Sequence, residues 1–157
     1  MIKSSVEINT LVDIHNHTAW SDGDNSIEDI VSRAEKYQLD QIGISDHYEM
    51  VQNLDAYIMG IEEVRKKYEN LVVLTGIEIK TTTLITLSNG ELNKLNNLDY
   101  ILIEYIEYQK DIESIMRQLG QILEQLRCKI GFAHMDLSRL RTFRIPMLNF
   151  KKNMIFS

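Results

Sequence analysis

The sequence has one cysteine, no long apolar run and no excess of positive charge, and each of these shortages excludes a class of protein. The single cysteine, Cys128, cannot form a disulfide within the chain. No apolar run approaches the ~18 residues of a membrane span, and residues 1–10 lack the ~7–15-residue apolar segment of a secretory signal. We therefore expect a cytoplasmic protein with no membrane partner.

The charge balance also limits the partners. The formal net charge is -6 and the pI is about 5.2, which argues against a broad basic face for nucleic acid or anionic membranes. Bound divalent cations would offset part of this negative charge. The only proline is Pro146, and no repeat or linker is visible, so we expect residues 1–157 to form a single domain.

Apolar runs alternate with amphipathic segments along the chain. The amphipathic segments repeat with helical spacing at 27–37, 57–68 and 112–126, and Asn25 with Glu28 is placed as a capping box for the first of them. Such alternation predicts repeated βα units and a parallel sheet. The five apolar runs that we expect to be strands are 10–15, 41–45, 71–79, 98–105 and 129–134.

Residues 80–97 are harder to assign. The Thr-rich first part fits either a strand or a loop, and only the "ELNKL" segment at 91–95 favours a short helix.

All four histidines lie at the carboxyl ends of expected strands. His15 and His17 close the first strand, His47 follows the second, and His134 ends the fifth, while Glu78 lies near the end of the third. The loops of parallel α/β folds converge at this edge, which is where ligands and catalytic groups gather.

The spacing and the chemistry of these residues indicate a metal site. Side chains alternate along a strand, so Asp13, His15 and His17 would project to one side. Imidazole nitrogen together with carboxylate oxygen suits zinc, manganese or iron. Asp46, next to His47, could orient a ligand from behind.

Each of these residues also has a plainer interpretation. A single strand-end histidine such as His134 is commonly a hydrogen-bonded structural residue, and residues 21–25, "SDGDN", have the composition of a turn. Glu78 resists such an interpretation, because a carboxylate within "LVVLTGIEI" would be buried and buried charges need a partner or a metal. One metal site accounts for all of these residues together.

These motifs resemble those of the polymerase and histidinol phosphatase (PHP) superfamily. The similarity covers residues 11–136, and residues 54–79 are further similar to the histidinol-phosphatase branch. The motifs that carry the resemblance are "DIHNHTAWSDG", "GISDH", "GIE" and "AH", in this order.

The resemblance implies a distorted (β/α)7 barrel that binds up to three divalent metals at its carboxyl-end mouth and hydrolyses phosphoesters. Carried over by motif, His15 and His17 would bind the first metal. Glu78 would bridge the first and second metals, and His134 would bind the second. The third metal would be bound by Asp22 and His47.

The chain departs from the family pattern in two places. Family members usually carry a histidine after the fourth strand, where this chain has Glu104, either an oxygen ligand or a structural carboxylate. The family's final Asp-x-His pair is also missing, and the chain is short by about two βα units. We therefore expect an incomplete barrel of about five βα units, with an open edge covered by the C-terminal tail or by a second copy in a homo-oligomer.

The function that follows is hydrolysis of a small phosphomonoester, with histidinol phosphate as one candidate. Two cations that share Glu78 would lower the pKa of a water towards neutrality, and the resulting hydroxide would attack phosphorus. Arg139, Arg141 and Arg144 could clamp the phosphate or form a solvated basic tail.

Two alternative functions stay open. One is a nuclease or nucleotide-trimming phosphoesterase, although the acidic composition gives no sign of a nucleic-acid groove. The other is a weakly active or inactive domain that binds metal or a partner, which the missing ligands and the short barrel favour.

Overall fold

Five parallel strands form one curved sheet within residues 10–106 and 111–134, the part of the chain that the computed structural model describes. Their order in the sheet is β1-β2-β3-β4-β5, so each strand pairs with its neighbour in sequence. The strands are β1 (Val12–Asp13), β2 (Gln41–Ile44), β3 (Val72–Lys80), β4 (Tyr100–Glu104) and β5 (Lys129–Phe132).

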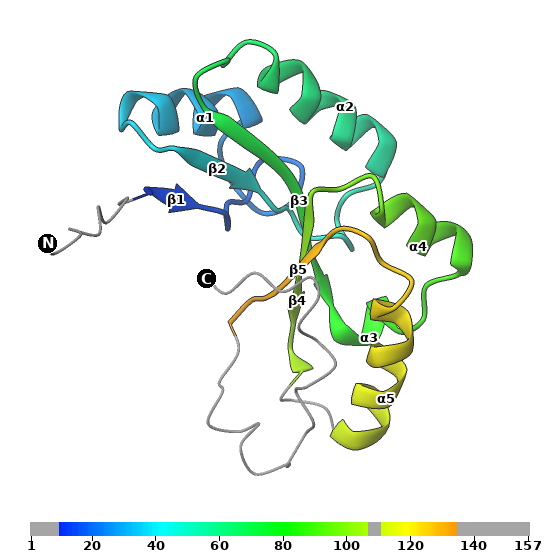
Figure 1. Cartoon of the computed structure of the whole chain (residues 1–157). Helices are drawn as coiled ribbons and strands as arrows, with labels where there is room; N and C mark the ends of the chain where they lie inside the picture. The colour runs from blue at the N-terminus through cyan, green and yellow to red at the C-terminus, as the bar shows by residue number, and fades with distance from the viewer. Residues whose placement is uncertain (1–9, 107–110, 135–157) are drawn as a thin grey trace, which may run out of the picture.

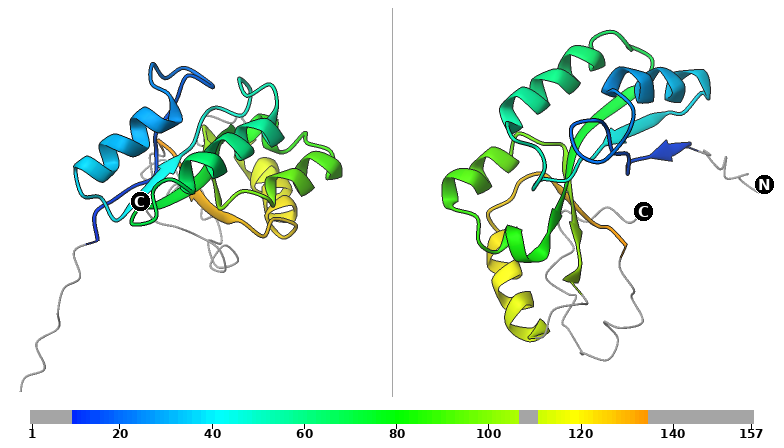
Figure 2. Two further views of the ribbon diagram at one scale, coloured as in Figure 1. Left: turned by 90° about the horizontal axis from the view of Figure 1, so that it is seen from above. Right: turned by 180° about the vertical axis from the view of Figure 1, so that it is seen from behind.

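Helices connect the strands and lie along the convex side of the sheet (Figures 1 and 2). The result is a curled half-barrel of alternating strands and helices, which confirms the predicted incomplete α/β barrel. Among the described residues, no helix has the length and apolar character that crossing a membrane requires. The helices are α1 (Ile27–Lys36), α2 (Leu54–Arg65), α3 (Thr81–Leu84), α4 (Asn89–Leu95) and α5 (Ile112–Leu123).

The predicted apolar stripes pack against the convex face of the sheet. In α5, Ile112, Leu119 and Ile122 are buried, one or two helical turns apart, and α1 and α2 bury corresponding stripes. These side chains join those of the strands in the main apolar core.

The N-cap of α1 lies one residue later than predicted. Ser26, not Asn25, accepts a hydrogen bond from the Asp29 backbone, and the Asp29 carboxylate accepts one from the Ser26 backbone. Asn25 belongs to the preceding loop, where its carbonyl accepts a hydrogen bond from the Ala19 backbone (2.9 Å). The capping box therefore forms with Asp29, and Glu28 takes no part in it.

The Thr-rich part of residues 80–97 is helical, which neither a strand nor a loop describes. Strand β3 continues to Lys80 and the chain turns at once into α3. Buried Thr81 donates a hydrogen bond from Oγ1 to the Glu104 carbonyl (2.7 Å), which ties this turn to the end of β4. The predicted short helix over "ELNKL" is confirmed as α4, which begins with a capping box between Ser88 and Glu91.

The first strand is shorter than residues 10–15. It covers only Val12–Asp13, because the chain then leaves the sheet to form a loop beside the end of β2. In that loop the Asn16 carbonyl accepts a hydrogen bond from the Ser45 backbone (2.8 Å), and the Asn16 side chain donates to the Gly43 carbonyl (3.1 Å). His15 and His17 are thus loop residues, and strand alternation does not explain how they converge.

A small apolar cluster around Tyr100, with Leu102 and Ala133, fills the concave side of the sheet. Tyr100 of β4 is fully buried and donates a hydrogen bond from its hydroxyl to the Ile14 carbonyl (2.6 Å), across the inside of the half-barrel. Two glycines make room for it. A Cβ atom would lie 2.2 Å from the Tyr100 ring at Gly76 and 2.3 Å from the Tyr100 hydroxyl at Gly43.

Candidate metal centre

The Glu78 carboxylate is fully buried, and side chains of all four histidines point towards it. Its Oε2 lies 3.0 Å from His17 Nε2, 3.3 Å from His15 Nε2 and 3.4 Å from His47 Nδ1. The other oxygen, Oε1, lies 3.7 Å from His134 Nε2. The structure thus brings Glu78 and the four histidines close together.

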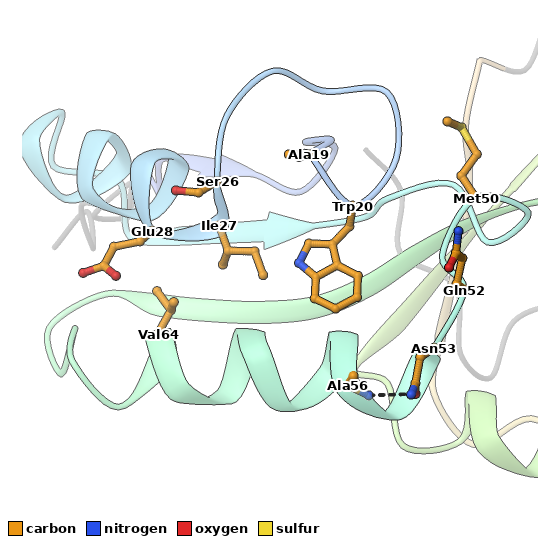
Figure 3. Close-up of a pocket in the computed structure, with 10 residues that line it drawn as sticks. All are labelled: Ala19, Trp20, Ser26, Ile27, Glu28, Met50, Gln52, Asn53, Ala56 and Val64. Atoms are coloured by element: carbon orange, nitrogen blue, oxygen red, sulfur yellow. Dashed lines mark hydrogen bonds between the residues drawn. The ribbon is translucent and has the colours of Figure 1, made fainter.

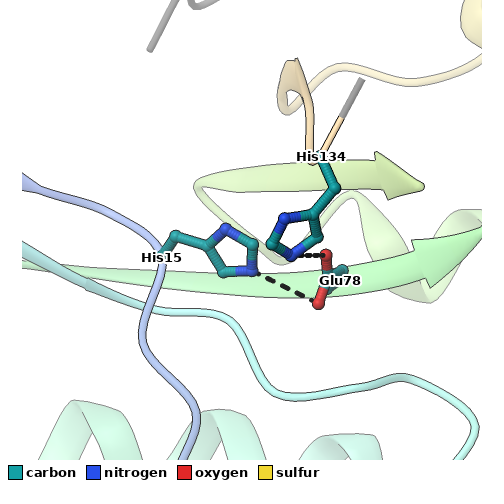
Figure 4. A group of neighbouring side chains, drawn as sticks. All are labelled: His15, Glu78 and His134. Atoms are coloured by element: carbon teal, nitrogen blue, oxygen red, sulfur yellow. Dashed lines mark ion pairs between the residues drawn. The ribbon is translucent and has the colours of Figure 1, made fainter. Parts of the chain in front are cut away.

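Four separate segments bring these side chains together at the carboxyl edge of the sheet. Glu78 comes from β3, where an isolated parallel bridge joins its backbone to that of His47 in the loop after β2. His15 comes from the loop after β1 and His134 from the residues after β5, so the two rings approach Glu78 from different sides (Figure 4). Short connections at parallel strand ends produce this convergence.

The charge of Glu78 is maintained by its neighbours. Burial by itself raises the pKa of this carboxyl, but the contact with His15 and the charges of His15, His47 and His17 hold it below its usual value. In return, the contact with Glu78 raises the pKa of His15, against the opposing effect of burial. A buried anion therefore stands among the imidazole groups.

Polar atoms at the centre lack hydrogen bonds despite their close approach. Within the described part of the chain, buried His17 Nε2, His47 Nδ1 and both Glu78 carboxylate oxygens find no hydrogen bond of acceptable geometry. Buried polar atoms without partners are rare and costly in native proteins. Imidazole nitrogens and carboxylate oxygens that converge in this way fit a divalent transition metal such as zinc, manganese or iron.

The ligand atoms form two groups around the shared carboxylate. His15, Glu78 and His134 form one, and His17, His47 and Glu78 form the other, with ligand atoms in each group within 4.8 Å of one another. The resemblance instead pairs His15 with His17 and pairs His47 with Asp22. Glu78 is common to both groups, as a bridging carboxylate would be.

Asp22 lies behind His17. Its Oδ1 is 2.7 Å from His17 Nδ1, the ring nitrogen that points away from Glu78, and its Oδ2 is 3.6 Å from His47 Nε2. The hydrogen bond with His17 lowers the pKa of Asp22. A carboxylate in this position keeps the proton of His17 on Nδ1 and leaves Nε2 free to bind a metal.

Asp46 and Asp13 support the loops that carry the ligands. Buried Asp46 accepts hydrogen bonds from the Thr18 backbone (2.7 Å), the Thr18 hydroxyl (2.8 Å) and the Ser21 hydroxyl (2.6 Å). It thereby holds the loop between His17 and Asp22, and does not contact the ring of its neighbour His47 in any hydrogen bond that we find among the described residues. Exposed Asp13 accepts a hydrogen bond from the His15 backbone (3.2 Å).

A third cluster lies on the β4 side of the centre and contains a residue that the sequence did not indicate. Glu104 ends β4, is only 1% exposed, and lies with its Oε1 3.7 Å from His47 Nδ1. Glu49 joins His47 and Glu104 in a group whose ligand atoms are within 4.8 Å of one another. The sequence could have indicated Glu49 through its position, because it lies two residues beyond His47 in a loop at the carboxyl edge of the sheet.

The predicted phosphate-binding residues Arg139, Arg141 and Arg144 lie outside the described residues.

Unusual backbone conformations occur at the ends of β4 and β5. His134 has φ 53° and Tyr105, which follows Glu104, has φ 61°. Non-glycine residues seldom adopt this left-handed region, and such conformations concentrate at functional sites.

A hollow of about 630 Å³ lies next to the metal centre's loops but not around its ligands. It is bounded by the loop before α1, by α1 itself and by α2, and the Trp20 side chain points into it (Figure 3). Trp20 packs edge-on against Tyr57, with ring centroids 5.7 Å apart. None of the candidate metal ligands that the structure describes lines this hollow.

An α/β half-barrel with histidines and a buried glutamate at its carboxyl edge defines a class, the metal-binding barrel proteins that carry their site on strand-end loops. The family model of the PHP domain matches residues 13–136, and the chain belongs to this family of metal-dependent phosphoesterases, whose domains bind divalent metals. No curated protein matches the chain.

Proposed function

We propose that this protein hydrolyses small phosphomonoesters in a metal-dependent reaction and belongs to the histidinol-phosphatase-like branch of its family. The similarity of residues 54–79 to that branch supports this assignment. The acidic composition favours a small substrate over nucleic acid, because it gives no sign of a basic groove that would bind a polynucleotide.

The observation that carries the proposal is the buried Glu78 carboxylate among four imidazole rings. A buried carboxylate with two unsatisfied oxygens would destabilise the fold unless a cation completed the site. The family membership indicates what such a site is used for, since PHP domains are metal-dependent phosphoesterases.

Two groups of residues in this site would bind metal ions. His15 and His134 would hold one metal together with Glu78, while His17 and His47 would hold a second metal with the same carboxylate. Bound divalent metals supply the positive charge that neutralises phosphate oxygens and lowers the pKa of a water.

Other residues position these ligands. Asp22 holds the proton of His17 on Nδ1, and Asp46 fixes the loop between His17 and Asp22 through Thr18 and Ser21. Arg139, Arg141 and Arg144, which lie beyond the described residues, would hold the phosphate of the substrate.

A second candidate function is metal binding without turnover. It is favoured by Glu104, which stands where the family resemblance leads us to expect a histidine, and by the 64% exposure of the His134 side chain. An exposed ligand holds a metal less rigidly than a buried one.

Metal content and hydrolysis test the proposal together. Protein purified without chelator is expected to contain at least one equivalent of zinc, manganese or iron by elemental analysis. With Mn²⁺ added, it is expected to hydrolyse p-nitrophenyl phosphate and histidinol phosphate faster than bis(p-nitrophenyl) phosphate or an oligonucleotide. Glu78→Ala and His15→Ala should each reduce the rate by more than about a hundredfold, because each removes a metal ligand.

The matched control is Glu69→Gln, which changes an exposed carboxylate just before the amino end of β3, at the opposite end of the strand from Glu78. It should leave the rate unchanged. A rate that Glu78→Ala does not affect would assign the activity to a contaminant, and bound metal without hydrolysis of any phosphoester would support the second candidate.

A further inference from the structure

A cluster of His47, Glu49 and Glu104 lies beside the Glu78-centred groups and has a different chemical character. Two of its three members are carboxylates, and one ligand atom from each lies within 4.8 Å of the others. His47 and Glu49 come from the loop after β2, and Glu104 comes from the end of β4. The cluster thus spans two strand ends on the β4 side of the metal centre.

Glu104 is the residue that points to a ligand. Its side chain is 1% exposed, and its Oε1 is buried with no hydrogen-bond partner in the described part of the chain. The one ion-pair contact found for it there is His47 Nδ1 at 3.7 Å, which is too long for a hydrogen bond. A second carboxylate, Glu78, lies 3.4 Å from the same nitrogen. Glu78 is also surrounded by three other histidines, whereas the contact of Glu104 with this shared ring is long.

Glu49 is held in place at the rim of the cluster. Its Oε1 accepts hydrogen bonds from the Lys80 backbone (3.2 Å) and from the Thr83 hydroxyl (2.5 Å) at the start of α3. These contacts fix the carboxylate to the turn between β3 and α3. Thr81 in the same turn donates a hydrogen bond to the Glu104 backbone carbonyl, so this turn contacts both the Glu49 side chain and the Glu104 backbone.

We propose that His47, Glu49 and Glu104 bind a divalent cation that prefers oxygen ligands, Mn²⁺ or Mg²⁺, at a site separate from the histidine-rich groups around Glu78. Carboxylate-rich sites suit these cations, whereas sites dominated by imidazole suit zinc and iron. The cation would be the positively charged partner of the buried Glu104 carboxylate. The chain therefore combines two kinds of metal site at one edge of the sheet.

The two kinds of site are coupled through one ring nitrogen. His47 Nδ1 lies between Glu78 and Glu104, and a single nitrogen lone pair can bind only one cation. We therefore expect a cation at the carboxylate-rich site to withdraw His47 from the group with His17 and Glu78. This proposal concerns binding alone and does not depend on hydrolysis.

Titration of the full chain with metals tests the site. The protein is stripped with a chelator and titrated by calorimetry with Zn²⁺ and, in a separate experiment, with Mn²⁺, and bound Mn²⁺ is recorded by electron paramagnetic resonance. Glu104→Gln and Glu49→Gln each keep the shape of the side chain but replace a negatively charged carboxylate ligand by a neutral amide. Both are expected to weaken Mn²⁺ binding by more than about tenfold and to leave the number of bound Zn²⁺ ions unchanged.

The control is Glu69→Gln, which removes an exposed carboxylate outside the cluster and should retain the Mn²⁺ affinity of the parent chain. Glu49 is exposed, so Glu49→Gln should fold normally and keeps the test valid even if Glu104→Gln does not fold. Unchanged Mn²⁺ affinity in Glu49→Gln, or equal losses of Zn²⁺ and Mn²⁺ in the variants, would overturn the proposal. Loss of hydrolysis with intact Mn²⁺ binding would contradict only the proposed function.

Discussion

At the scale of single residues, the centre consists of ligands and of side chains that prepare them. Glu78 is fully buried, and its carboxylate faces four histidine rings instead of solvent. Asp22 prepares His17 from the opposite side of the ring, through the hydrogen bond to Nδ1. The metal affinity of such a site depends on both kinds of residue.

The role of Asp22 can be measured with a conservative change. In Asp22→Asn the side-chain amide can donate a hydrogen bond to His17 Nδ1, which places the ring proton on Nε2 and blocks the ligand atom. We expect the Zn²⁺ affinity to fall by about 10–100-fold in a calorimetric titration. Asp24→Asn, in the same loop and also exposed, is the matched control and should bind Zn²⁺ like the parent chain. Equal affinities in the two variants would remove Asp22 from the site.

At the scale of elements, the strands position the centre because their carboxyl ends meet at one edge. Strand β3 extends to Lys80 and pairs with both β2 and β4, so Glu78 is anchored by neighbours on either side. On the concave face, Tyr100 passes over Gly43 and Gly76 to reach the Ile14 carbonyl. Ile14 directly precedes His15, so this packing also places a metal ligand.

A methyl group in that packing should be costly. In Gly76→Ala the new Cβ would lie 2.2 Å from the Tyr100 ring, which is fully buried and cannot move aside. We expect the free energy of unfolding, measured with urea, to decrease by about 2–3 kcal/mol. Gly120→Ala in α5 is the control, because no atom beyond the adjoining residues and the backbone of α5 itself lies within 4 Å of the added Cβ among the described residues. Alanine is favoured over glycine in a helix, so Gly120→Ala should instead stabilise the protein by about 0.5–1 kcal/mol. Similar effects of the two substitutions would contradict the packing seen at Tyr100.

At the scale of the whole molecule, the sheet has open edges in the part of the chain that the structure describes. Strand β1 pairs only with β2 there, and Leu11 and Val12 are about half exposed, at 53% and 47%. Unpaired edge strands with apolar side chains favour pairing with another chain. We propose that a second copy of the chain covers this edge.

Sedimentation velocity tests this proposal over a range of protein concentrations. We expect a dimer or a larger species, and Val12→Lys should shift it towards the monomer, because a lysine on an edge strand opposes pairing. Met59→Lys is the matched control, since Met59 is exposed to a similar degree (63%) but lies on α2. A parent chain that stays monomeric at every concentration would contradict the proposal.

The local pattern of the sequence by itself determined the elements and the edge at which chemistry gathers. Apolar stripes such as Ile112, Leu119 and Ile122 depend only on helical periodicity, and the histidines could be placed because strand ends are readable from short apolar runs. The one-residue error at the N-cap arose because Asn25 and Ser26 are both good capping residues, and the loop contact of Asn25 with Ala19 decided between them.

Only the tertiary structure decided how the site is grouped and what supports it. His15 and His17 converge through a loop held by Ser45 and Gly43, and Tyr100 bonds to a carbonyl 86 residues away in sequence. Glu49 joins the centre because α3 turns back against the loop that follows β2. Periodicity reports on neighbours within a few residues, whereas these contacts depend on the register and curvature of the whole sheet, and so could not be predicted from any local pattern.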